Sequence, residues 1–292
     1  MPPVLKYRPA RAILFVSLGT GFMAGADICM KFMAGEHSLP AILLLRNFMI
    51  LAVIIVILRR TGKWAQATAA PSPLLLLRSV AMGVAPLFFY YALTFMPVAE
   101  TTAIFLLIPV IVALLAVPVL KESADPRRLS AAVIGLAGTL MIVRPGTEAF
   151  APASLLALGA AIAAASYQLL TRMLAGRQGT MASLFYPWTI GTLLCLPFAL
   201  LRWTPPVTPT GWLMVALTAT LALSGNFCLV SAYEHGHAGL IAPFVYLQLV
   251  WAIVLAWLFL GDFPDAWSMA GMLTIVCAGL LLVRRSRLAR RG

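Results

Sequence analysis

Charged residues are scarce in this sequence. Only 10% of its 292 residues are Asp, Glu, Lys or Arg, whereas 62% are apolar, and the mean hydropathy is +0.98. A soluble domain carries about a quarter charged residues, so this chain has too few polar side chains to cover a globule of its size. The composition therefore excludes a soluble protein and indicates a chain that folds in a lipid bilayer.

Cysteine and histidine are also rare, and catalytic motifs are absent. The four cysteines lie inside apolar stretches without CxxC or Cys/His spacing, which favours small buried side chains over a disulfide framework or a metal site. His235 and His237 share a short loop with no third ligand nearby. The sequence has no HExxH, GxSxG or Walker-type motif. We therefore expect no metal, no cofactor and no enzyme activity.

Long apolar runs fill the chain instead. A bilayer core of about 30 Å takes roughly 20 apolar residues per helix, and charges together with Pro and Gly divide the sequence into ten such runs. The prediction is an all-α membrane protein with ten transmembrane helices. The predicted spans are 12–33, 39–58, 74–95, 99–120, 128–143, 153–174, 182–201, 211–233, 238–260 and 267–283.

Basic residues are distributed asymmetrically between the loops. Fifteen Lys and Arg fall in the two tails and the even-numbered loops, and only Arg144 and Arg202 fall on the other side. The positive-inside rule then predicts that both termini are cytoplasmic and that the protein is a multi-pass inner-membrane protein. The net charge of +12 is explained by this topology signal and by attraction to anionic lipid, so nucleic acid is not an expected partner.

The chain contains an internal repeat. An offset of 140 aligns Ala92 with Ala232 and Arg144 with Arg284, and an offset of 141 aligns Asp27 with Gln168 and Lys31 with Arg172. The prediction is two five-helix repeats, residues 12–143 and 153–283. Because five is odd, the second repeat enters the membrane from the opposite side. Inverted repeats of this kind are typical of secondary transporters.

Several short motifs recur in a fixed order along the chain. They are Asp27-x3-Lys31, Arg46-Asn47, Arg78, the runs 89–93 and 96–101, Pro109, Lys121-Glu122 and Arg144-Pro145-Gly146. In this order the sequence resembles the drug/metabolite transporter superfamily and its EamA-domain members, over nearly the whole chain. The second half departs from the pattern, with Asp262 where Glu is usual and no Arg in its second helix.

The resemblance implies a ten-helix fold of inverted repeats around a central cavity, lined mainly by helices 1, 3, 4, 6, 8 and 9. It also implies a transport function, because members of the YddG type export amino acids and others move cofactors such as S-adenosylmethionine or riboflavin.

Three charged residues, Asp27, Lys31 and Arg46, lie inside the first two predicted helices. A charge at mid-bilayer costs at least about 3 kcal/mol, so it is kept only when paired, hydrated or useful. Asp27 and Lys31 are four residues apart on one helical face, and Asp27 and Arg46 are both roughly 10 Å deep. Two interpretations remain: a charged cluster that handles substrate or a proton, or an interhelical ion pair that fixes packing while Lys31 snorkels outward.

Two further charges lie near predicted helix ends. Arg78 is four residues inside the third span, where its guanidinium can reach lipid phosphate or take part in gating. Glu100 begins the fourth span, where a carboxylate favours the helix amino terminus, with an outer gate as the alternative.

Polar and aromatic side chains are the remaining candidates for substrate binding. They are Tyr90, Gln168, Asn226, Tyr246, Gln248 and Trp251. Amides in membrane helices often only bond across helices, but a mostly apolar pocket with a few convergent polar groups is what a small-molecule site needs.

The sequence therefore predicts a secondary transporter that works by alternating access and exports small metabolites, with amino acids as the favoured class. A carrier of a cofactor such as S-adenosylmethionine or riboflavin and a passive small-solute channel are the alternatives. The expected partners are a small-molecule substrate and the lipid bilayer, and the expected assembly is a monomer or a weak homodimer.

Overall fold

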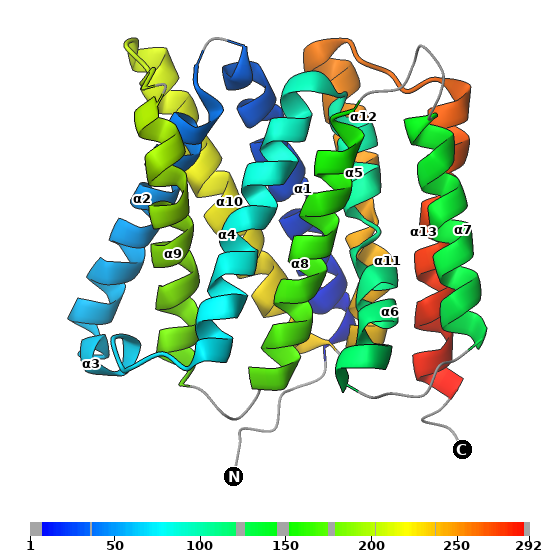
Figure 1. Cartoon of the computed structure of the whole chain (residues 1–292), viewed down its shortest axis with the longest axis horizontal. Helices are drawn as coiled ribbons and strands as arrows, with labels where there is room; N and C mark the ends of the chain where they lie inside the picture. Colours follow the sequence, from blue (N-terminus) through cyan, green and yellow to red (C-terminus); the bar gives the residue numbers. More distant parts are fainter. Residues whose placement is uncertain are drawn as a thin grey trace.

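The computed structural model of the protein describes residues 8–35, 37–120, 126–144, 152–174, 179–201, 203–236 and 238–288. Within these ranges the regular structure is entirely helical. Figure 1 shows the helices packed into one bundle, with their axes running roughly along a common direction. This confirms the predicted all-α class.

The first half of the chain supplies helices α1 to α7. Helix α4 begins after Ser72, whose hydroxyl accepts a hydrogen bond from the Leu75 amide at 3.2 Å and caps the helix. The bounds are α1 Pro9–Ala34, α2 Leu39–Arg60, the single turn α3 Trp64–Ala67, α4 Pro73–Phe95, α5 Val98–Phe105, α6 Ile108–Leu120 and α7 Pro126–Val143.

The second half supplies α8 Ser154–Leu174, α9 Thr180–Leu201, α10 Pro209–His235, α11 Ala238–Val245, α12 Leu247–Leu260 and α13 Ala266–Leu288. Their bounds follow those of the first half at the offset seen in the sequence. Helices α5 and α7 begin 140 residues before α11 and α13, and α4 ends 140 residues before α10. The helix pattern of the chain is thus repeated.

Seven helices are long and apolar enough to cross a membrane, and three shorter apolar helices accompany them: Ser130–Val143, Leu247–Leu260 and Ala266–Leu281. The protein is therefore a multi-pass membrane protein. The count of ten crossings and the cytoplasmic placement of both termini stay predictions.

Two of the predicted spans are not continuous helices. Span 99–120 breaks between α5 and α6, and span 238–260 breaks at Tyr246 between α11 and α12. The first break has a direct cause: Pro109 has no N–H to donate to the Phe105 carbonyl, so the helical ladder is interrupted there. In Figure 1, α5 and α6 still follow one another along the bundle.

Glycines allow the closest helix pairs to approach. A Cβ on Gly19 of α1 would lie 3.1 Å from the Gly225 carbonyl oxygen of α10, and a Cβ on Gly138 of α7 would lie 2.7 Å from the Gly271 carbonyl oxygen of α13. Small residues at such crossings are the usual means of helix packing in membranes. Helix α4 packs on α8 as α1 packs on α10, which leaves the centre of the bundle between these pairs.

Candidate functional site

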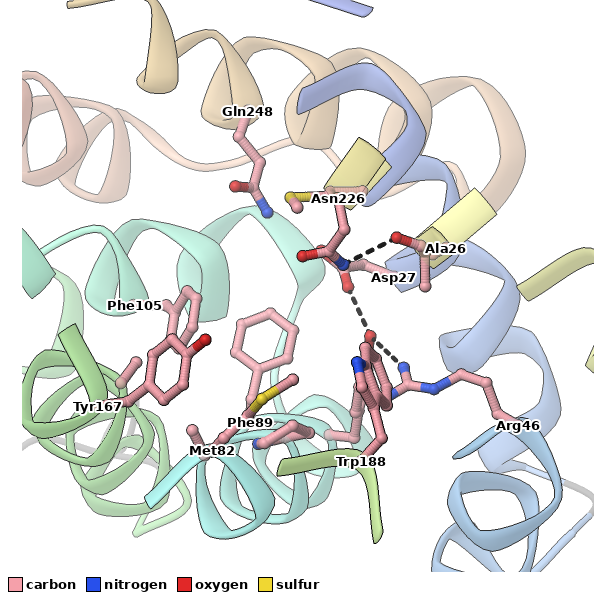
Figure 2. A pocket seen from close by; sticks show the side chains of 16 residues that line it. Ala26, Asp27, Arg46, Met82, Phe89, Phe105, Tyr167, Trp188, Asn226 and Gln248 are labelled. Atoms are coloured by element: carbon pink, nitrogen blue, oxygen red, sulfur yellow. Dashed lines mark hydrogen bonds between the residues drawn. The ribbon is translucent and has the colours of Figure 1, made fainter. Parts of the chain in front are cut away.

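A cavity of about 240 Å³ lies at the centre of the bundle (Figure 2). Eight helices contribute to it, from both halves of the chain. On α4 the lining positions follow one helical face, because residues three and four apart share a face. The lining residues are Met23, Ala26, Asp27, Arg46, Met82, Ala85, Pro86, Phe89, Tyr90, Phe105, Ala164, Tyr167, Trp188, Ala222, Asn226 and Gln248.

A chain of hydrogen bonds joins three of these side chains. Arg46 donates from Nη1 to the Tyr90 hydroxyl at 2.9 Å, and that hydroxyl donates to Asp27 Oδ1 at 3.0 Å. All three side chains are buried, with Asp27 only 5% and Arg46 only 4% exposed. The predicted meeting of Asp27 and Arg46 at one depth is found, but Tyr90 stands between the two charges.

The guanidinium of Arg46 is held from further sides. Its Nη2 donates to Asn47 Oδ1 at 3.3 Å, and its Cζ lies 5.1 Å from the centre of the Tyr90 ring. Charge-assisted hydrogen bonds and a ring face together lower the cost of keeping a cation out of water. Arg46 and Asp27 therefore balance each other electrostatically across the phenol.

Two amides from the second half complete the polar wall. Asn226 donates from Nδ2 to the Ala222 carbonyl at 2.9 Å within α10. Gln248 of α12 is a polar neighbour of the Asp27 carboxylate. Figure 2 shows both amides beside Asp27. The structure thus brings together five of the predicted site residues: Asp27, Arg46, Tyr90, Asn226 and Gln248.

Aromatic rings form the opposite wall, and sequence reasoning missed most of them. Phe89 and Phe105 pack with their ring centres 4.9 Å apart, and Tyr167 and Trp188 face the same space (Figure 2). No local signal separates these rings from the lipid-facing aromatic residues of the same helices, because both occur in uniformly apolar stretches.

Arg78 does not reach the lipid phosphates, contrary to one prediction. It is 7% exposed, and its three donors are used by the Thr171 hydroxyl at 2.7 Å, the Ser183 carbonyl at 3.1 Å and the Tyr167 hydroxyl at 2.9 Å. Each of the three guanidinium nitrogens therefore donates to an acceptor on α8 or α9. Arg78 thereby holds Tyr167 in the cavity wall.

Lys31 and Glu100 also have partners that the sequence did not indicate. Lys31 does not pair with Asp27: its ammonium donates to the Leu93 and Met96 carbonyls at 2.6 and 2.8 Å, because unpaired carbonyls at a helix end attract a cation. Glu100, in the first turn of α5, accepts a hydrogen bond from the Ser268 hydroxyl at 2.7 Å. Both lie outside the cavity lining.

Three predicted binding residues also lie away from the cavity. Gln168 is exposed, and Tyr167 takes the cavity position, because one residue along a helix turns the side chain by about 100°. Tyr246 packs its hydroxyl against Gly279, on the face of α12 opposite Gln248. Trp251 lies against Gly21 and is 40% exposed. Their roles in substrate binding stay predictions.

Metal ligands do not gather in the part of the chain that the structure describes: it contains no group of three or more His, Cys, Asp or Glu side chains that can hold a metal ion. The cavity offers instead one carboxylate, a screened guanidinium, two amides and a set of aromatic rings. Such groups bind and orient a small organic molecule and provide no activated nucleophile.

Family comparison decides what kind of protein has this cavity. The model of the EamA-like transporter family matches residues 10–144 and again residues 151–284. The chain belongs to the EamA-like transporter family. Its curated relatives are named as transporters of small molecules, and the chain spans about 65% of the length of the first of them.

The curated relatives of this chain differ in the substrate and the direction of transport that their names state. The chain is 30% identical over 196 residues to an S-adenosylmethionine uptake transporter of Rickettsia prowazekii, a match that covers 66% of this chain and 65% of the relative. It is 27% identical over 216 residues to the pseudopaline exporter CntI of Pseudomonas aeruginosa, a match that covers 74% of this chain and 76% of the relative. A riboflavin transporter of Vibrio cholerae is 28% identical over 157 residues, which cover 54% of this chain and 53% of the relative.

A solved crystal structure shares the fold of this chain. The two superpose with a TM-score of 0.62 at 21% sequence identity, and the match covers 94% of this chain and 98% of the other.

Proposed function

We propose that this protein is a secondary transporter that exports a small amine-bearing metabolite, with amino acids as the favoured class, by alternating access. The observation that carries the proposal is the Asp27–Tyr90–Arg46 chain in the wall of a central cavity. Burial of charge in a membrane protein is costly and is retained where it serves a pathway.

The size and lining of the cavity favour a small substrate. About 240 Å³ is at or below the small end of ordinary ligand pockets, which run from about 300 to 1,000 Å³. Most of the lining is apolar or aromatic, and its few polar groups converge on Asp27. An amino acid with an apolar side chain matches this combination.

The repeated helix pattern supports the transport mechanism. We take residues 12–143 and 153–283 as two inverted repeats that exchange conformations, so that the cavity opens first to one side of the membrane and then to the other. Placement in the inner membrane with both termini in the cytoplasm, and action as a monomer or weak homodimer, belong to the same proposal.

A cofactor carrier is the second candidate, favoured by the aromatic wall. The rings of Phe89, Phe105, Tyr167 and Trp188 offer stacking surfaces for a planar heterocycle. S-adenosylmethionine and riboflavin are therefore included as test substrates, as the names of two relatives suggest.

Counterflow in proteoliposomes tests the proposal. Vesicles loaded with unlabelled compound should accumulate the same radiolabelled compound transiently, for at least one member of a panel of amino acids, S-adenosylmethionine and riboflavin. Asp27→Asn should abolish this signal while the protein stays folded, and Asp265→Asn, outside the cavity, should preserve it.

Equilibration without transient accumulation would show a passive channel instead, and retention of full counterflow in Asp27→Asn would remove Asp27 from the mechanism.

A further inference from the structure

We propose that the cavity recognises its substrate by a cationic group held at Asp27, and that Arg46 does not bind a substrate carboxylate. This inference deepens the proposed function and rests on it for the identity of the site. It assigns the substrate to the class of small organic ammonium compounds, with an apolar or planar body and with or without an acid group.

The carboxylate of Asp27 lines the cavity. Its Oδ1 accepts the hydrogen bond from Tyr90 at 3.0 Å, while its Oδ2 is not an acceptor in any hydrogen bond shown among the described residues. The Gln248 amide lies close enough to interact with the same carboxylate. A carboxylate with one oxygen fixed and one available is oriented to accept from a bound ammonium group.

Arg46, by contrast, is only 4% exposed, and both of its terminal nitrogens already donate to protein groups. Nη1 serves Tyr90 and Nη2 serves Asn47. Nε has no partner among the described residues and is fully buried, so a ligand in the cavity cannot reach it. The guanidinium therefore stands behind the Tyr90 ring, where it compensates the charge of Asp27 without contacting substrate.

The other walls of the cavity suit a cation as well. Tyr167, Trp188 and Phe89 line the same cavity as Asp27 (Figure 2), and ring faces attract ammonium groups. The Tyr167 ring is fixed by Arg78, whose Cζ lies 4.7 Å from its centre. No described lining residue other than Arg46 carries a positive charge.

Matched ligands separate the two possible modes of recognition. Phenylalanine and methionine methyl esters keep the ammonium group and lose the carboxylate, whereas the N-acetyl amino acids do the opposite. Each is added to the purified protein in detergent, and its affinity is read from ligand-induced thermal stabilisation. The esters should bind wild type at least about tenfold more tightly than the N-acetyl compounds, and Asp27→Asn should remove that preference.

Either of two results would overturn the inference: N-acetyl compounds that bind as tightly as the esters, or a preference for the esters that survives in Asp27→Asn. Asp265→Asn is the control, because its carboxylate lies outside the cavity. The assay measures binding alone, so its result is separate from counterflow, whose absence for every compound would reject the proposed function.

A second inference comes from an independent observation. We infer that Lys31 and Arg172 are alternating latches at the two ends of the bundle. Lys31 is engaged: its ammonium holds two carbonyls at the carboxyl end of α4 and so ties α1 to α4 at that end. Arg172, the residue that the repeat places at the position of Lys31, is exposed and makes no hydrogen bond to a described residue.

The two residues lie at opposite ends of the bundle. Arg78, near the start of α4, donates to the Thr171 hydroxyl near the end of α8. Arg172 therefore lies at the end of the bundle where α4 starts. Lys31 lies at the other end, where α4 finishes. The end of α10 is also at the Arg172 side, because the Arg8 amide at the start of α1 donates to the His235 carbonyl at 3.0 Å.

The carbonyls at the end of α10, which correspond in the repeat to the acceptors of Lys31, therefore lie at the same end of the bundle as Arg172. Among the described residues, α1 packs against α4 while α8 makes no comparable contact with α10. The latch is closed at the Lys31 end and released at the Arg172 end, and the exchange of conformations between the two repeats would reverse this.

Side-specific cysteine labelling tests the latches. Ala164→Cys, in the cavity wall, is placed in a variant whose four native cysteines are replaced, and a membrane-impermeant maleimide is applied from either face. Lys31→Met should raise labelling from the Lys31 side by about tenfold, because two charge-assisted hydrogen bonds are lost. Arg172→Met, the matched control, should not raise labelling from that side. Unchanged labelling in a monodisperse Lys31→Met protein, or an equal effect of Arg172→Met, would refute the inference.

Discussion

The two halves of this chain share a helix pattern but contribute different side chains to the cavity. The first half contributes the charges, Asp27 and Arg46, together with Tyr90, and the second contributes amides and rings, Asn226, Gln248, Tyr167 and Trp188. Asp27 corresponds in the repeat to Gln168, which is exposed and does not line the cavity. The helix pattern is therefore repeated, whereas the side chains at the cavity are not.

The largest expected effect comes from breaking the charge balance in the first half. Arg46→Met leaves the Asp27 carboxylate buried without a compensating cation, which should destabilise the protein by about 3–5 kcal/mol. The midpoint of thermal unfolding in detergent measures the change. The double variant Asp27→Asn/Arg46→Met should recover most of the lost stability. If it stays as unstable as Arg46→Met alone, the two charges are not coupled through Tyr90.

Removing only the bridging hydroxyl should have the next largest effect. Tyr90→Phe keeps the ring but leaves Arg46 Nη1 and Asp27 Oδ1 each without its bond, at about 1–3 kcal/mol for a buried group that loses its partner. Tyr91→Phe is a matched control, since Tyr91 is 48% exposed. The midpoint of thermal unfolding and the counterflow signal should both fall in Tyr90→Phe and stay unchanged in Tyr91→Phe. Equal behaviour of the two variants would contradict the bridging role.

The close packing of the two halves is tested at the crossing of α7 and α13. A Cβ on Gly138 or on Gly271 would lie 2.7 or 2.6 Å from the carbonyl oxygen of the other glycine, so Gly138→Ala and Gly271→Ala should each cost about 1–3 kcal/mol through overpacking. Gly35→Ala, where no atom lies within 4 Å of the added Cβ, serves as control. Clearly unequal costs for Gly138 and Gly271 would show that the crossing is asymmetric.

The smallest expected effect on stability concerns the ion pair between Arg144, at the end of the first half, and Asp265 in the second half. Arg144 donates to the Asp265 carboxylate, and this hydrogen bond lowers the pKa of Asp265 from 3.8 to about 2. A carboxyl whose folded pKa is depressed contributes stability above its unfolded pKa, and that contribution is lost as pH falls from about 4 to about 2. Because the Asp265 side chain is 52% exposed, we expect less than about 1 kcal/mol.

Asp265→Asn isolates this charge effect, because Asn can cap α13 as Asp265 does when it accepts from the Ser268 amide at 2.8 Å. Wild type and variant should differ slightly in unfolding midpoint at pH 6 and converge below about pH 2. A difference that persists in acid would point to a cause other than the ion pair.

The sequence predicted the helices well and the site in part, for separable reasons. Hydropathy places most helix ends within a few residues, and the expense of burying charge identified Asp27 and Arg46 as central. The acceptors of Lys31 are backbone carbonyls of another helix, which no side-chain pattern reveals. Gln168 was chosen over Tyr167 because polarity was the criterion, although a shift of one residue on a helix moves a side chain out of the cavity. Trp188 and Phe105 occur in apolar runs where aromatic residues are common for other reasons.

The contacts of Arg78 also bear on how the chain is made. Its three acceptors, on Thr171, Ser183 and Tyr167, lie about a hundred residues further along the chain on α8 and α9. While the ribosome has delivered only the first half, α4 holds a guanidinium that has none of its final partners, and that half cannot reach its finished packing alone. We therefore expect the first repeat to complete its packing only after α8 and α9 have been inserted.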